Sequence, residues 1–178
     1  NQTPFYAEMG GQVGDTGSVI KHDSEIFITD CKKVGNFHLH EVLINSGKLC
    51  KGDTAKLLID LGRREKINCN HSATHLLHSA LRQVLGDHVT QKGSLVSDDK
   101  LRFDISHPNQ ISNKEIFKIE NIVNSEIRLN QSVNTDIMDS EKAFKSGALA
   151  LFGERYSEKV RVVSMGSEYL SGGYYSSE

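Results

Sequence analysis

The residues best suited to chemistry are two histidines, His71 and His75, four positions apart in the stretch 70–86. A helix advances about 100° per residue, so this spacing places both imidazoles on one helix face. Such a pair can bind one divalent ion, or it can hold a substrate and a water molecule by hydrogen bonds. The same spacing also occurs on solvated helices that bind nothing, and the helix alone favours that simpler interpretation.

The stretch 70–86 predicts an amphipathic helix with its own end signals. Asn70 is a good N-cap residue and Gly86 a good residue just past the last turn. His78 and Arg82 are expected to share the face of the two histidines. The opposite, apolar face is expected to consist of Ala73, Leu77, Ala80, Leu81 and Val84.

The residue after His71 argues against a protease of the zincin type. In those enzymes a glutamate follows the first histidine and acts as general base. Here Ser72 occupies that position.

A second candidate segment lies upstream, in residues 10–17, which contain four glycines: Gly10, Gly11, Gly14 and Gly17. Glycines allow tight turns and close approach of another group to the backbone. No Gly-Lys-Ser/Thr sequence follows, and the spacing of a dinucleotide-binding fingerprint is absent. The segment therefore predicts a functional loop or a bulged strand. It is neither a Walker-type phosphate-binding loop nor a dinucleotide-binding loop.

Composition places the chain among ordinary globular proteins. It has 178 residues, 37% of them hydrophobic and 25% charged, enough for one domain or two small ones. No apolar run approaches the ~18 residues of a membrane span, and we expect a cytoplasmic protein without membrane contact. The net charge of −2 offers little general attraction for nucleic acid.

The cysteines and the first residues complete this picture. Cys31, Cys50 and Cys69 are widely spaced and predict reduced thiols rather than disulfides or a zinc ribbon. The chain opens at Asn1 without an initiator methionine, which suggests a piece of a longer protein.

Short β-branched and aromatic runs, separated by turn residues, predict an antiparallel block in the first third of the chain. The expected strands are 18–20, 25–31, 36–44 and 54–60. His38 and His40 share one face of the third strand and are expected to be exposed on an edge. The block predicts a small antiparallel β-barrel or sheet that ends near Gly62.

The remainder alternates helices and strands. Residues 89–96 and 101–106 predict a hairpin, and Ser112 with Glu115 forms a capping box before a helix at 113–130. A strand at 133–137, a short helix from Asp139 to Gly147 and a strand at 160–165 follow. The fold class is therefore α+β, with a β-barrel-like subdomain at 1–62 and a mixed helix and antiparallel-sheet core at 63–178.

Several blocks together resemble the editing region of alanyl-tRNA synthetases, related to free-standing trans-editing deacylases. They span nearly the whole chain in the right order. The matching blocks are residues 3–8, 10–17, 70–85, 91–94, 101–104, 147–154 and 160–166.

The resemblance implies hydrolysis of the ester in mischarged seryl- or glycyl-tRNA(Ala) at a zinc site. His71, His75 and Gln12 would then be catalytic, with both histidines as zinc ligands. The implied partners are the acceptor end of tRNA(Ala) and the rest of the synthetase in cis. Candidates for substrate binding are Gly10, Gly11, Thr16, Gln91 and Lys92, although Lys92 can equally be an exposed strand charge.

The chain departs from the family where the other two zinc ligands belong. A Cys and a His are replaced by Ser171 and Tyr175. A neutral hydroxyl and a phenol with a pKa near 10 are weak substitutes for a thiolate and an imidazole. The alternative function is therefore a catalytically impaired fragment that acts as a tRNA-docking or structural module.

Overall fold

The structure is a computed structural model that describes residues 2–145, 158–165 and 174–176. The contacts between Cα atoms divide the chain into two units, Asn1–His71 with Gly93–Arg102, and Ser72–Lys92 with Phe103–Glu178. None of the helices in the described ranges combines the length and apolar composition that a membrane span requires.

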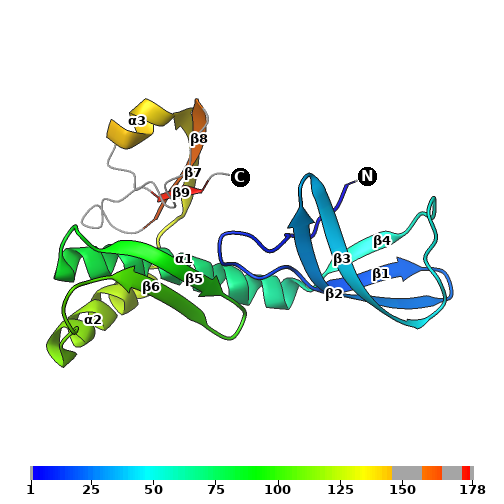
Figure 1. Cartoon of the computed structure of the whole chain (residues 1–178), viewed down its shortest axis with the longest axis horizontal. Helices are drawn as coiled ribbons and strands as arrows, with labels where there is room; N and C mark the ends of the chain where they lie inside the picture. The colour runs from blue at the N-terminus through cyan, green and yellow to red at the C-terminus, as the bar shows by residue number, and fades with distance from the viewer. Residues whose placement is uncertain (1, 146–157, 166–173, 177–178) are drawn as a thin grey trace. The chain divides into compact units, whose positions relative to one another are not determined.

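The first unit contains a four-stranded antiparallel sheet in the order β3-β2-β1-β4 (Figure 1). Its strands are β1 (Gly17–Lys21), β2 (Ser24–Val34), β3 (Phe37–Ser46) and β4 (Lys56–Ile59). One face of the sheet covers a core of Phe5, Ala7, Val19, Ile26, Ile28 and Cys31. The four predicted strands are thus confirmed.

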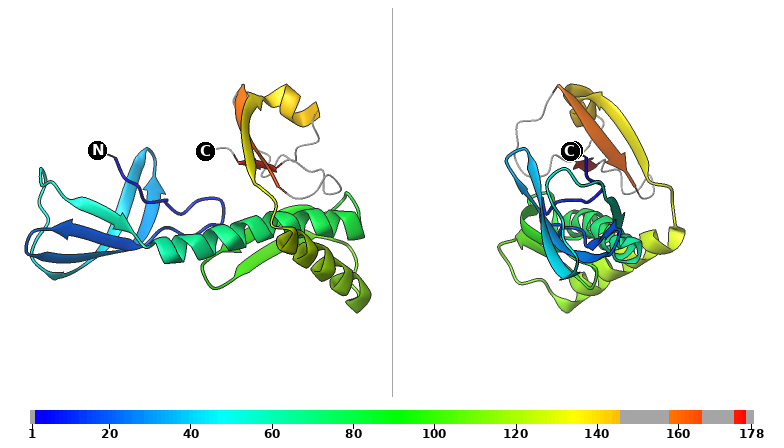
Figure 2. Two further views of the ribbon diagram at one scale, coloured as in Figure 1. Left: turned by 180° about the vertical axis from the view of Figure 1, so that it is seen from behind. Right: turned by 90° about the vertical axis from the view of Figure 1, so that its right-hand side faces the viewer.

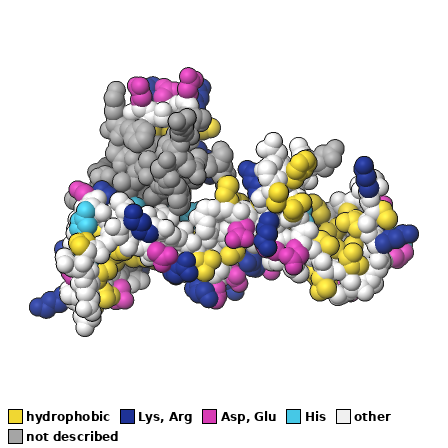
Figure 3. All heavy atoms as spheres, in the orientation of Figure 1, with side chains coloured by type: hydrophobic (Ala, Val, Ile, Leu, Met, Phe, Trp, Pro, Cys, Tyr) yellow, Lys and Arg dark blue, Asp and Glu magenta, His cyan; other side chains and the backbone are white. Residues whose placement is uncertain are grey.

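The predicted closed barrel is wrong for the described residues. β3 and β4 are the two outer strands, and they do not pair with each other. The face opposite the core also remains exposed: Leu58, Phe27 and Leu43 lie along it at 38%, 38% and 54% exposure. Figure 3 shows such hydrophobic side chains on the surface of this sheet. Alternating strand patterns specify faces and neighbours, whereas closure requires pairing between the outer strands.

β3 is an edge strand as expected, but its two histidines differ. His38 is exposed, whereas His40 is half-buried. The His40 ring packs edge-on against Phe5 with centroids 5.4 Å apart, and its Nε2 shares a 2.8 Å hydrogen bond with Thr3 Oγ1. The prediction that both are exposed is therefore wrong for His40, because the N-terminal segment covers it.

Helix α1 (Leu61–Leu85) begins ten residues before the predicted start, which placed the N-cap at Asn70. Asp60, not Asn70, caps it: the Asp60 carboxylate accepts the Arg63 N–H at 3.0 Å, and its carbonyl accepts the Arg64 N–H at 3.0 Å. The end is as predicted, since Gly86 follows with φ of +113°. Helix α1 runs through both units.

Two further elements also contribute to both units. β5 (Thr90–Val96) and β6 (Leu101–Ser106) form the predicted hairpin, with a Ser97 N–H to Lys100 carbonyl bond of 2.9 Å in the turn.

α2 (Asn113–Leu129) starts at the predicted capping box of Ser112 and Glu115. In the second unit, buried residues of α1, α2 and the hairpin region form one core around Ala80, Leu81, Val89 and Ile119.

The rest of the second unit contains a three-stranded antiparallel sheet in the order β7-β8-β9 (Figure 2). Its elements are β7 (Asn134–Asp139), α3 (Ser140–Lys145), β8 (Lys159–Ser164) and β9 (Tyr174–Ser176). β7, α3 and β8 match predictions, while β9 was not expected. The predicted helix end at Gly147 lies outside the described residues.

Candidate functional site

The glycine segment of the first unit forms a tight reverse turn. Met9 and Gln12 exchange backbone hydrogen bonds of 3.2 and 3.0 Å, and the two residues between them are Gly10 and Gly11 with φ of +61° and +88°. Two successive positive φ values suit glycine and few other residues. The prediction of a glycine-dependent loop is therefore confirmed at these two positions.

This turn docks onto the end of β5. The Val96 N–H donates to the Gly11 carbonyl at 2.8 Å, and the Val13 N–H donates to the Val96 carbonyl at 3.0 Å. The Ser94 hydroxyl adds a 3.1 Å bond to the Gly10 carbonyl. A Cβ on Gly11 would lie 2.6 Å from the Ser94 carbonyl oxygen, so only glycine permits this approach.

The docked turn presents Gln12 to helix α1. Gln12 is 8% exposed, and its carboxamide oxygen Oε1 lies 2.6 Å from Nδ1 of the half-buried His71. This bond joins the two segments that the sequence singled out for chemistry. They are 59 positions apart in the chain.

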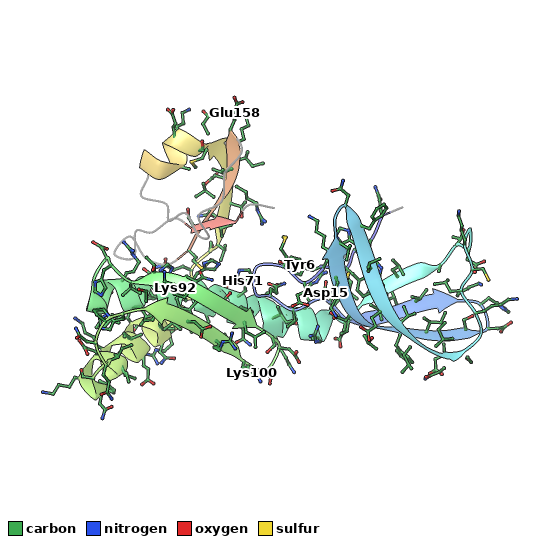
Figure 4. The ribbon with its side chains drawn as sticks, in the orientation of Figure 1. Tyr6, Asp15, His71, Lys92, Lys100 and Glu158 are labelled. Atoms are coloured by element: carbon green, nitrogen blue, oxygen red, sulfur yellow. The ribbon has the colours of Figure 1, made fainter. Side chains whose placement is uncertain are left out.

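Two consecutive arginines in the first turn of α1 hold the rest of the loop. Arg64 forms an ion pair with the buried Asp15, and it also donates to the Pro4 carbonyl at 2.8 Å. Arg63 donates to the Gly14 carbonyl at 2.8 Å and to Asp98 at 3.1 Å. Tyr6, whose backbone N–H donates to Asp15 at 2.6 Å, lies beside Asp15 in Figure 4. Sequence reasoning missed this clamp, because no local pattern pairs a loop acid with a helix arginine.

The histidine face of α1 is narrower than predicted. His71 and His75 are half-buried, but His78 is only 5% exposed and packs against Phe103 with ring centroids 5.1 Å apart. Neither ring nitrogen of His78 has hydrogen-bond geometry with any described residue. Burial, with a smaller effect of the Arg82 charge, lowers the pKa of His78, while the nearby Val89 carbonyl opposes the shift. The placement of His78 on a polar front was therefore wrong: it belongs to the core.

The structure brings together Gly10, Gly11, Gln12 and His71. Thr16 follows in the same unit, half-buried just before β1, and its carbonyl accepts the Asp60 N–H at 2.9 Å. Gln91 and Lys92 belong to the second unit. As neighbours in β5 they point to opposite faces, with Gln91 half-buried and Lys92 exposed.

A complete metal shell is not present among the described residues, which contain no group of three His, Cys, Asp or Glu side chains able to hold an ion. His71 and His75 supply two imidazoles. Ser171 lies outside the described residues, and Tyr175 is described only by its backbone, which pairs with Val162. The donors present therefore fall short of a four-ligand zinc site.

The chain is similar in sequence to known aminoacyl-tRNA synthetases. The family model described as "tRNA synthetases class II (A)" matches residues 1–63. An alanine–tRNA ligase of Wolbachia pipientis is 53% identical over 175 residues, which is 97% of this chain and 20% of that protein. These matches support an alanyl-tRNA synthetase region. An alanine–tRNA ligase of Parvibaculum lavamentivorans is 54% identical over 168 residues, 93% of this chain and 19% of the ligase. The chain thus spans about a fifth of the length of these curated alanyl-tRNA synthetases.

Proposed function

We propose that this chain is the editing region of an alanyl-tRNA synthetase and hydrolyses the ester of mischarged seryl- and glycyl-tRNA(Ala). The contact between Gln12 and His71 carries the proposal, since it joins the Gly-Gly-Gln turn to the histidine helix. The substrate is proposed to be tRNA(Ala) because 97% of the chain aligns with an alanine–tRNA ligase.

The chemistry requires a water molecule, a proton acceptor and a bound ester. Water gives up a proton as its oxygen adds to the ester carbonyl, the bond between that carbon and the ribose oxygen breaks, and the ribose oxygen takes up a proton to become a hydroxyl. His71 and His75 are the side chains that orient the water and receive or return its proton. Neutral imidazoles are suited to this near pH 7.

Zinc is a proposed but weakly held cofactor of this site. His71 and His75 would hold it, and a bound zinc ion would polarise the ester carbonyl as a Lewis acid. Because the donor set of the described residues is incomplete, the proposed steps require only the protein side chains and water.

Selection against alanyl-tRNA(Ala) needs a polar group, since a pocket that accepts serine also has room for alanine. A hydroxyl-reading group left unpaired by alanine supplies the discrimination. Thr16 is our candidate for that group, and Gln91 is a candidate for lining the amino acid pocket. Lys92, which is exposed, is suited to a phosphate of the acceptor end.

The proposed setting is a cytoplasmic synthetase whose other parts help to hold tRNA(Ala). The net charge of −2 gives the isolated chain little attraction for RNA. We therefore expect slow hydrolysis of seryl-tRNA(Ala) by the isolated chain and slower hydrolysis of alanyl-tRNA(Ala).

The test is a deacylation assay with separately prepared seryl- and alanyl-tRNA(Ala). Replacing both His71 and His75 with Ala should reduce the seryl rate to the spontaneous rate. Ser171→Cys with Tyr175→His should raise zinc occupancy and rate together. If that restored protein holds zinc and still shows no hydrolysis above background, the editing proposal fails.

The second candidate is a tRNA-docking or structural module without catalysis. Ser171 and Tyr175, at the positions of two family ligands, favour it. It predicts binding of tRNA(Ala) with no deacylation by either the natural or the restored chain.

A further inference from the structure

We infer that Gln12 is a positioning residue that fixes the tautomer of His71, placing the ring's lone pair on Nε2. The inference deepens the proposed function and rests on it for its catalytic meaning. The tautomer itself can be measured without any activity. The family resemblance implied instead that Gln12 is itself a catalytic residue.

The geometry of the contact assigns donor and acceptor. Oε1 of the Gln12 carboxamide faces Nδ1 of His71 at 2.6 Å, a short hydrogen bond. A carbonyl oxygen only accepts, so Nδ1 must carry the hydrogen. In a neutral imidazole the lone pair then resides on Nε2.

The position of Gln12 is fixed by backbone bonds on both sides. Its own N–H and C=O are bonded to Met9, and the adjacent Gly11 and Val13 are bonded to Val96. Gln12 is also buried, with 8% of its surface exposed. An acceptor held this firmly restricts the rotation of the His71 ring as well as its tautomer.

The tautomer determines which ring nitrogen of His71 has a lone pair for a proton or a cation. Nε2 is the nitrogen that would accept a proton from water or donate its lone pair to a cation. The opposite tautomer would present an N–H there, which can do neither. Gln12 therefore acts through His71, because its carboxamide oxygen is already bonded to the His71 ring.

The experiment measures the imidazole tautomer by long-range ¹H–¹⁵N NMR on the full chain at pH 8, where histidines with ordinary pKa values are neutral. His71→Ala assigns the signals of His71. We expect the Nδ1–H pattern for His71 in the natural chain. Gln12→Met keeps the size of the side chain but removes the acceptor, and it should shift His71 toward the Nε2–H form. Gln12→Glu retains an acceptor oxygen, so Nδ1 of His71 should keep its hydrogen, whether the ring is neutral or becomes protonated beside the carboxylate.

His88 and His107 provide an internal reference, because they belong to the second unit and share a 2.9 Å bond with each other. Their signals should be unchanged in both variants. An Nε2–H pattern for His71 in the natural chain, or an unchanged pattern in Gln12→Met, overturns the inference.

Deacylation assays of the same variants separate this inference from the proposed function. Gln12→Met should lower kcat at least tenfold with little change in KM, and Gln12→Glu should recover part of it. If the tautomer responds as expected but neither the natural chain nor the zinc-loaded restored chain deacylates seryl-tRNA(Ala), positioning by Gln12 is supported and the proposed function is overturned. A loss of activity in Gln12→Met with an unchanged tautomer overturns the positioning role alone.

Discussion

Arg64 and Asp15 form an ion pair that fastens the first turn of α1 to the end of the glycine loop. Asp15 is only 2% exposed, and its carboxylate also accepts the Tyr6 N–H. The loop that carries Gln12 is therefore held at two places, by Ser94 and Val96 near its tip and by Arg64 at its base. This pair decides how firmly the loop meets the helix that bears His71.

Arg64→Ala should destabilise the first unit by about 2 kcal/mol, because it leaves the buried Asp15 carboxylate without its half-exposed cationic partner. The control is Lys100→Ala, which breaks an exposed pair with Asp99 at 3.7 Å and should cost well under 1 kcal/mol. Urea unfolding measures both. Equal losses in the two variants would show that the Arg64 pair contributes no more than a surface contact.

Gly11→Ala and Gly10→Ala form a matched pair of loop substitutions. Both glycines have positive φ, so each alanine should cost about 1–2 kcal/mol of backbone strain. At Gly11 the added methyl group also meets the Ser94 backbone, whereas at Gly10 nothing lies within 4 Å. Gly11→Ala should therefore be the more damaging substitution in thermal unfolding, and it should displace the NMR signals of His71. A larger loss at Gly10 would contradict the docking of the turn on β5.

Local sequence signals predicted much of the fold. The Ser112 and Glu115 capping box, the Gly86 stop and the alternating strands all depend on residues close in sequence, and each was confirmed. The start of α1 was missed because Asp60 follows directly on a strand-like run, so its capping role was hidden by that pattern. Asn70 looked like a cap but lies inside the helix, where its side chain donates to the Ser97 carbonyl at 2.8 Å.

Local sequence patterns did not predict the contacts between residues that are far apart in the chain. The pairing of Gln12 with His71, and of Asp15 with Arg64, depends on how the loop returns to α1, which periodicity does not encode. The burial of His78 depends on Phe103 and the hairpin covering that side of the helix. Closure of a barrel likewise requires hydrogen bonds between the two outer strands, which an alternating sequence pattern does not encode. The barrel prediction failed because β3 and β4 do not pair.

His78 should make the stability of the second unit depend on pH. Burial lowers its folded pKa below the ordinary 6.5, so the unfolded chain binds the proton more readily. The linkage then has a definite sign: stability falls as pH drops through 6.5 toward the lower folded pKa and is recovered above 6.5.

His78→Leu should remove this part of the pH dependence in urea unfolding between pH 7.5 and 5.5. His22→Asn is the control, because the His22 side chain is 92% exposed, and it should retain the natural slope. A slope in His78→Leu equal to that of the natural chain would show that other groups cause it.

The purified chain should retain well below one zinc ion per molecule after dialysis without chelator. Of the four zinc ligands that the family resemblance implies, only the two imidazoles are strong donors here, because Ser171 and Tyr175 offer oxygen groups at the other two positions. His75→Ala should reduce the retained zinc further. Elemental analysis measures both proteins. One tightly held zinc per natural chain would mean that other residues complete the shell.

Thr16→Val should narrow the ratio of the seryl to the alanyl deacylation rate. Valine keeps the β-branched shape but loses the hydroxyl that we propose reads the seryl group. Losing one hydrogen bond of about 1.4 kcal/mol in the transition state lowers the seryl rate about tenfold and leaves the slow alanyl rate nearly unchanged. The carbonyl of Thr16, which accepts the Asp60 N–H, is unaffected by the change. Thr16→Ser retains the hydroxyl and should keep the natural ratio. If Thr16→Val keeps that ratio too, another group reads the seryl hydroxyl.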